Sequence, residues 1–115
     1  MKKLNIALKI NDYKINTTGY INKNIISFKD DKKENTEMIY DLNKDILIRD
    51  NKEITIKMYF NKETDNIEYT LKEHDKKFFQ NLEKIKLLKD ETNIIISYRI
   101  EESLFNLSLH YEEVK

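Results

Sequence analysis

Short stretches in which apolar and polar residues alternate run along nearly the whole chain. The first places Leu4, Ile6, Leu8 and Ile10 on one side, and the segment 105–111 repeats the pattern near the C-terminal end. Successive side chains of a β-strand point to opposite faces of its sheet, so this alternation is typical of strands with one buried face. The pattern predicts an all-β protein.

The alternating stretches lie close together and are separated by short polar segments. Beyond the first and last, they cover 13–17, 25–29, 38–42, 46–48, 54–60, 67–71 and 94–100. Connections this short leave no room for parallel crossovers and favour sequential antiparallel pairing. Asn11 and Asp12 suit a tight hairpin, because both residue types tolerate turn conformations. Gly19, the only glycine, suits a bulge or a sharp bend such as a barrel corner.

The segment from Asp75 to Asp90 departs from this alternation. Its apolar residues recur at steps of three and four, at Phe78, Phe79, Leu82, Ile85 and Leu88. This spacing predicts a helix near 76–89, with Asp75 as its N-cap. A strand that places Ile85 and Leu87 on one face is the alternative interpretation, because short apolar runs support both structures.

Composition limits the class of protein more than its activity. A chain of 115 residues predicts a single domain, 1–115, and 21 basic residues balance 21 acidic ones. The absence of cysteine excludes disulfides and thiolate metal sites and suits a reducing cytoplasm, where we expect the protein to reside. Abundant isoleucine, asparagine and lysine beside one alanine indicate an A/T-rich, bacterial genome. No apolar run is long enough for a membrane helix.

Four strand-like strings resemble the YwiB-like family of Firmicutes, a domain of unknown function. They are residues 25–30, 38–49, 57–60 and 95–100. The resemblance implies a calycin-like, lipocalin-type antiparallel up-and-down β-barrel, and it supplies no activity. It also implies strands where 78–89 shows helical spacing. A closed barrel agrees with the alternation, because closure removes exposed strand edges.

Residues suited to catalysis or metal binding are sparse. The two histidines, His74 and His110, are far apart in sequence, whereas a zinc site needs about four converging ligands. The adjacent acidic residues, such as Asp30 and Asp31, fall in expected turns, where water favours solvated charge over acid/base work. We therefore expect no metal, no cofactor and no catalytic residues. An enzyme built around Arg49, Arg99 or His110 is the least supported hypothesis.

Nucleic-acid binding is a further alternative, since small barrels stack bases on exposed aromatic residues. Most tyrosines, however, fall on the apolar side of their strands: Tyr13, Tyr40, Tyr69, Tyr98 and Tyr111. Acidic residues are interspersed with the lysines on the polar side. The sequence therefore favours core tyrosines and predicts neither a nucleic-acid nor a membrane partner.

The barrel interior has two interpretations. The inward-facing residues are large, which favours an interior filled by side chains. The same apolar walls also suit a pocket for a small apolar ligand, for which the candidate residues are Ile56, Met58, Tyr69, Tyr98 and Leu107.

The outward-facing positions carry a few apolar residues: Ile39, Leu47, Tyr59 and Ile95. If these gather, they form a surface for a homodimer or another protein. The main hypothesis is therefore a non-enzymatic binding or interaction module. The alternative is an intracellular carrier or sensor of a small apolar ligand held in the barrel.

Overall fold

The computed structural model describes residues 1–115 and contains eleven β-strands and no helix. Because it has no helix, the fold offers no helical segment that could span a lipid bilayer. The strands are β1 (Lys2–Ile10), β2 (Tyr13–Asn22), β3 (Ile25–Lys29), β4 (Glu37–Asp41), β5 (Ile46–Asp50), β6 (Ile54–Tyr59), β7 (Ile67–Leu71), β8 (Lys76–Gln80), β9 (Glu83–Lys89), β10 (Asn93–Ile100) and β11 (Ser103–Glu113).

All strands belong to one antiparallel sheet, which confirms the predicted all-β, up-and-down architecture. The order is β8-β7-β6-β5-β4-β3-β2-β1-β11-β10-β9, so strands that are adjacent in sequence pair with each other. The first and last strands, β1 and β11, also pair. The one exception is the junction between β8 and β9, which lie at opposite edges of the sheet. The sheet is therefore a curled half-barrel that stays unpaired at this junction.

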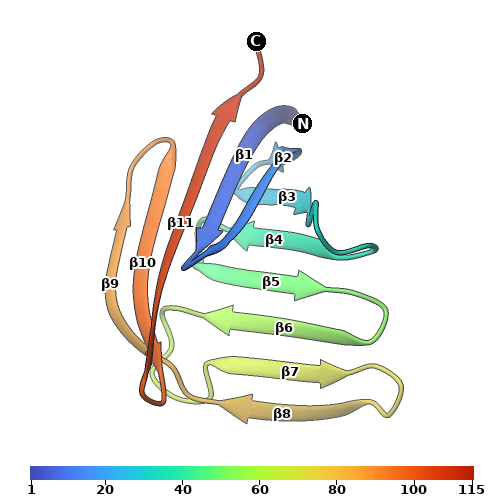
Figure 1. Ribbon diagram of the computed structural model, residues 1–115, viewed down its shortest axis with the longest axis vertical. Coiled ribbons are helices and arrows are strands. Elements are labelled where there is room, and N and C mark those ends of the chain that lie inside the picture. Colours follow the sequence, from blue (N-terminus) through green and yellow to red (C-terminus); the bar gives the residue numbers. More distant parts are fainter.

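The curled sheet forms two walls that face each other. In Figure 1, β3 to β8 run across the view, and we call them the transverse wall. Strands β9, β10, β11 and β1 run along the long axis, and together with β2 they form the axial wall. The core lies between the walls and includes Tyr40 and Ile26 from one and Leu8, Ile96 and Leu109 from the other.

The predicted inward tyrosines are confirmed as core residues. Each lies in the core or packs against it: Tyr13, Tyr40, Tyr69, Tyr98 and Tyr111.

The turns between strands use the residue types that tolerate a positive φ. Five of the seven non-glycine residues with positive φ are Asn or Asp, including Asn11 in the predicted first hairpin.

The helix predicted near 76–89 is wrong, because this segment forms β8 and β9. Two interruptions of strand periodicity produce the helical spacing. The chain turns at Asn81 and Leu82 between the strands. The register with β10 then shifts, since Ser97 lies opposite Lys86 but Tyr98 lies opposite Lys84. Ile85 is the extra residue of this irregularity, and the apolar spacing consequently becomes three instead of two.

Strand β5 faces the opposite way from the prediction. The run Ile46-Leu47-Ile48 is aliphatic throughout, so it contains no alternation that identifies the buried face. In the pairing with β4, Leu47 lies opposite the fully buried Tyr40, and Arg49 lies opposite Met38. Leu47 therefore faces the interior, not the outer surface as predicted, and Arg49 faces inward with it.

Gly19 lies in β2, at the first position where this strand pairs with β3 as well as β1. The pairing with β1 is continuous through this residue, so no bulge occurs here. A Cβ atom at this position would lie 2.3 Å from the Ser27 carbonyl oxygen and 2.6 Å from Ile6 Cδ1. Close approach of the neighbouring backbone is therefore what requires a glycine.

We expect the Gly19→Ala variant to lose about 1–3 kcal/mol of unfolding free energy, as overpacked sites do. Urea unfolding followed by circular dichroism measures this loss. Thr18→Ala at the adjacent exposed position is the control and should change stability little. Equal stabilities of the two variants would show that the neighbouring backbone relaxes around the added methyl group.

Side chains bridge the unpaired junction between β8 and β9. The fully buried Asn66, from the β6–β7 loop, accepts a hydrogen bond from the Leu82 amide (2.7 Å) and donates one to the Leu82 carbonyl oxygen (2.8 Å). A second amide hydrogen bond runs to the carbonyl oxygen of Lys62 (2.9 Å). Asn66 thus satisfies the backbone at the corner where no strand partner is present.

The edge strand β9 is held to the turn between β4 and β5 in the same way. Lys89 Nζ lies 2.9 Å from Oδ1 of the buried Asp45 and 2.9 Å from the carbonyl oxygen of Leu42. The same carboxylate accepts hydrogen bonds from Asn61 (2.8 Å) and from the Tyr40 hydroxyl (3.1 Å). Burial and the Asp45 carboxylate raise the pKa of Tyr40. This network fixes the end of the transverse wall that lies beside β9.

Candidate ligand-binding pocket

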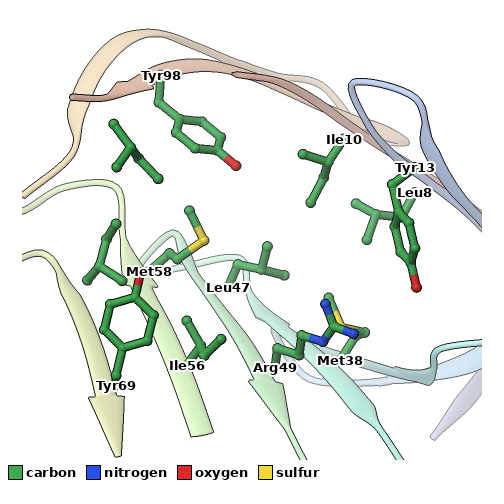
Figure 2. A pocket seen from close by; sticks show the side chains of 12 residues that line it. Leu8, Ile10, Tyr13, Met38, Leu47, Arg49, Ile56, Met58, Tyr69 and Tyr98 are labelled. Carbon is green, nitrogen blue, oxygen red and sulfur yellow. The ribbon is translucent and has the colours of Figure 1, made fainter. Parts of the chain in front are cut away.

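An apolar pocket of about 220 Å³ lies between the two walls. Figure 2 shows side chains entering it from both walls. Eleven of its twelve lining residues are hydrophobic, and Arg49 is the exception. The lining residues are Leu8, Ile10, Tyr13, Met38, Leu47, Arg49, Ile56, Met58, Ile67, Tyr69, Tyr98 and Ile100.

The pocket has a buried floor and a partly exposed rim. The floor residues are Leu8, Met38, Leu47, Ile67 and Tyr98, each at most 3% exposed. The rim residues are partly exposed: Ile10, Tyr13, Arg49, Ile56, Met58, Tyr69 and Ile100. A molecule that enters past the rim would therefore leave water for an apolar surface.

Four of the five residues predicted to line a ligand pocket do so: Ile56, Met58, Tyr69 and Tyr98. The fifth, Leu107, is 1% exposed and packs in the core opposite Ile10 and Ile96 of the neighbouring strands. The expectation that side chains fill the interior is therefore correct for the region around Leu107. It is wrong for the space lined by β1, β2, β4 to β7 and β10, where the pocket lies.

Tyr98 is the most unusual floor residue. Its ring stacks on Phe105 (centroids 5.3 Å apart) and contacts Phe60 at a tilt (5.4 Å), which fixes its direction. Figure 2 shows its hydroxyl pointing into the space between the walls. Tyr98 is only 2% exposed, and burial raises its pKa to about 12. Its hydroxyl makes no hydrogen bond within the protein, and because no buried side-chain oxygen or nitrogen lacks a partner, this oxygen reaches the open space of the pocket. It is therefore a protonated donor directed into an apolar pocket.

The other two pocket tyrosines differ from Tyr98, because each hydroxyl has a partner. Tyr69 donates to the side-chain oxygen of Gln80 (2.8 Å), and Tyr13 donates to Asp30 Oδ2 (2.5 Å). Burial and the Asp30 carboxylate raise the pKa of Tyr13 to about 12. Among the pocket hydroxyls, the donor of Tyr98 is thus the free one.

A cluster of polar residues surrounds Arg49 at the rim. One guanidinium nitrogen lies 3.5 Å from Asp30 Oδ2, and the Asp30 side chain has no exposed surface. The second oxygen of Asp30 accepts a hydrogen bond from the Lys32 amide (2.8 Å). The expectation that paired acidic residues are solvated is therefore wrong for Asp30. Hydrogen bonds and the guanidinium take the place of water around this carboxylate.

The remaining chemically active residues lie elsewhere. His110 contacts Asn93 (2.7 Å) and Glu112 (2.9 Å) on the outer face, and Arg99 forms an exposed ion pair with Glu83. His74 is exposed in the turn between β7 and β8. The fold thus does not bring Arg99 or His110 to Arg49. It also shows no group of three or more His, Asp or Glu residues that could hold a metal ion.

The alternation pattern did not predict that Arg49 lines the pocket. The hairpin register would have located it, because a turn over 42–45 sets Leu47 opposite Tyr40 and Arg49 opposite Met38.

No family model, no curated protein and no solved structure matches the chain.

Proposed function

We propose that this protein binds a small, mainly apolar molecule in the pocket between its two walls and acts as a carrier or sensor. The observation that carries the proposal is the apolar pocket itself, into which the Tyr98 hydroxyl points without a hydrogen-bond partner in the protein (Figure 2). The resemblance to the YwiB-like family and its calycin-type barrel supplies no activity and stays a prediction.

The size and lining of the pocket support a ligand of limited size. Ligand sites of about 300–1,000 Å³ accommodate drug-sized molecules, and this pocket measures about 220 Å³. An aliphatic cavity of about 150 Å³ already binds benzene and excludes water. The pocket therefore suits a molecule with a short hydrocarbon chain or a single ring.

The interaction module predicted from the sequence is the alternative function, and the open sheet edges are where a partner would bind. Apolar side chains are exposed there, on β8 at Phe78 and Phe79 and on β9 at Ile85 and Leu88. Both edges, however, carry lysines, and β9 contains the register irregularity. Proteins use lysines and bulges to prevent edge pairing. The predicted outer residues also do not gather, because Leu47 is internal and Ile95 lies on the other wall from Ile39.

Titration with 1-hexanol, followed by amide shifts in nuclear magnetic resonance spectra, tests ligand binding. We expect saturable shifts that are confined to residues lining the pocket. In Ile56→Phe the larger side chain occupies the pocket, so affinity should fall at least about tenfold, or 1.4 kcal/mol. Ile95→Phe makes the same exchange on the outer face and should bind like the wild type.

A third variant, Tyr98→Phe, removes only the unpaired hydroxyl. The loss of one hydrogen bond, about 1 kcal/mol, should weaken hexanol binding about fivefold. Saturable shifts that persist in folded Ile56→Phe would place the site elsewhere and contradict the proposal. Absence of saturable shifts in the wild-type protein would also contradict it.

A further inference from the structure

We infer that the ligand is an amphiphile with an anionic head, of the carboxylate class, which binds to Arg49 while its apolar tail occupies the pocket. This inference rests on the proposed function and adds the chemical class and the orientation of the ligand. It is carried by the position of Arg49 between two cavities of opposite character.

Arg49 lines the apolar pocket and also a second cavity outside its rim. The second cavity measures about 440 Å³ and is lined by polar and charged residues alone. These residues are Lys33, Glu34, Asn35, Thr36, Arg49, Asn51, Lys52 and Glu53. Arg49 is the one residue that lines both cavities. A molecule that spans the two must pass the guanidinium, with its apolar part inside and its polar part outside.

The guanidinium of Arg49 keeps its hydrogen-bond donors free. Its single ionic partner, Asp30, lies 3.5 Å away, and Arg49 donates no hydrogen bond to any protein group. Asp30 accepts its hydrogen bonds from Tyr13 and from the Lys32 amide instead. Arginine stays charged and presents five N–H donors in a planar fork that matches a carboxylate. Arg49 is therefore held at the rim by Asp30 and remains able to bind a second anion.

The charged residues that line the second cavity are compatible with an anionic head group of the ligand. Lys33 and Lys52 line it together with Arg49, and the two carboxylates among the lining residues are Glu34 and Glu53. Figure 2 shows the Arg49 side chain extending from β5 toward Tyr13 on the other wall, so the guanidinium stands between the walls. A head bound there would be half-buried, where a charge-assisted hydrogen bond is stronger than in open water.

The experiment compares hexanoate with 1-hexanol, which share a six-carbon chain and differ in the head group. We expect the wild-type protein to bind hexanoate more tightly than hexanol. Arg49→Met removes the donors and retains an unbranched side chain, so hexanoate affinity should fall at least about tenfold more than hexanol affinity. Arg99→Met on the outer face removes the same charge and should leave both affinities unchanged.

Arg49→Lys retains the positive charge without the fork and keeps the test decisive if Arg49→Met does not fold. It should weaken hexanoate binding more than hexanol binding. Two results would overturn the inference while the proposed function stands. One is saturable hexanol binding without a preference for hexanoate, and the other is equal loss of hexanoate binding in Arg49→Met and Arg99→Met. Failure of both molecules to bind would instead overturn the proposed function.

Discussion

Asn66→Asp should destabilise the fold by about 2–6 kcal/mol, because two carbonyl groups lose their donor at a cost of about 1–3 kcal/mol each. In the wild-type protein the Asn66 amide donates to the carbonyl oxygens of Leu82 and Lys62. An aspartate of the same shape directs a carboxylate oxygen toward both. Urea unfolding at neutral pH, followed by circular dichroism, measures the loss.

A partly exposed asparagine with a similar local role provides the control. The Asn51 side chain accepts hydrogen bonds from the amides of Glu53 and Ile54 in the turn before β6. Asn51→Asp keeps the side-chain oxygen that accepts both hydrogen bonds and places its second oxygen at a partly exposed position, so the stability should change by less than about 1 kcal/mol. If Asn66→Asp were no less stable than Asn51→Asp, the side-chain bridge would not be what holds the corner between β8 and β9.

The sequence predicts the strands where one face of the chain is apolar and the other polar. Strands β1, β10 and β11 alternate without interruption, and the structure places them as expected. The prediction fails around 76–89, because a turn and an extra residue each shift the period of the apolar positions. Ile85 and Leu88 lie more than 45% exposed although their spacing is typical of a buried helix face. The pairing of β9 with β10 determines that this segment is a strand, and the local spacing of its apolar residues carries no information about that pairing.

The candidate site shows the same limit at the level of single residues. Alternation in β6, β7 and β10 identifies Ile56, Met58, Tyr69 and Tyr98 as inward-facing, and all four line the pocket. Whether inward side chains meet or leave space depends on the distance between the walls, which no strand pattern encodes. Leu107 has the same pattern and lies in a filled region instead.

The side-chain bridges at the open junction bear on the proposed pocket, because they form where the sheet lacks pairing. Asp45 ends the turn and directly precedes β5, and Arg49 lies near the other end of that strand. The contact of Asp45 with Lys89 of β9 therefore fixes one end of β5 against the axial wall. The Arg49 end has no corresponding bridge from β9. There the contact runs through Asp30, which lies 3.5 Å from the Arg49 guanidinium and accepts a hydrogen bond from Tyr13 of β2.

Alkaline pH should unfold the protein over the range in which its buried tyrosines ionise. Six of the seven tyrosines have a raised pKa, with burial as the largest cause: Tyr13, Tyr40, Tyr59, Tyr69, Tyr98 and Tyr111. A raised pKa means that the folded state binds the proton more tightly than the unfolded state. The resulting stability is complete below pH 10 and is lost as the pH rises toward about 12. For the buried Tyr98 alone, a rise from 10.0 to about 12 corresponds to about 2–3 kcal/mol.

Circular dichroism and the phenolate absorbance of the buried tyrosines, recorded together during an alkaline titration, should change in one cooperative transition above pH 10, because ionisation of these rings requires unfolding. Tyr98→Phe removes one ionising group. For a given stability at neutral pH, its transition should therefore lie at a higher pH. Tyr20→Phe, at a position 46% exposed on the outer face, should leave the transition unchanged. If phenolate absorbance rose fully while the circular dichroism of the strands persisted, the tyrosine rings could not be enclosed between the walls, and the pocket that Tyr98 lines would lose its floor.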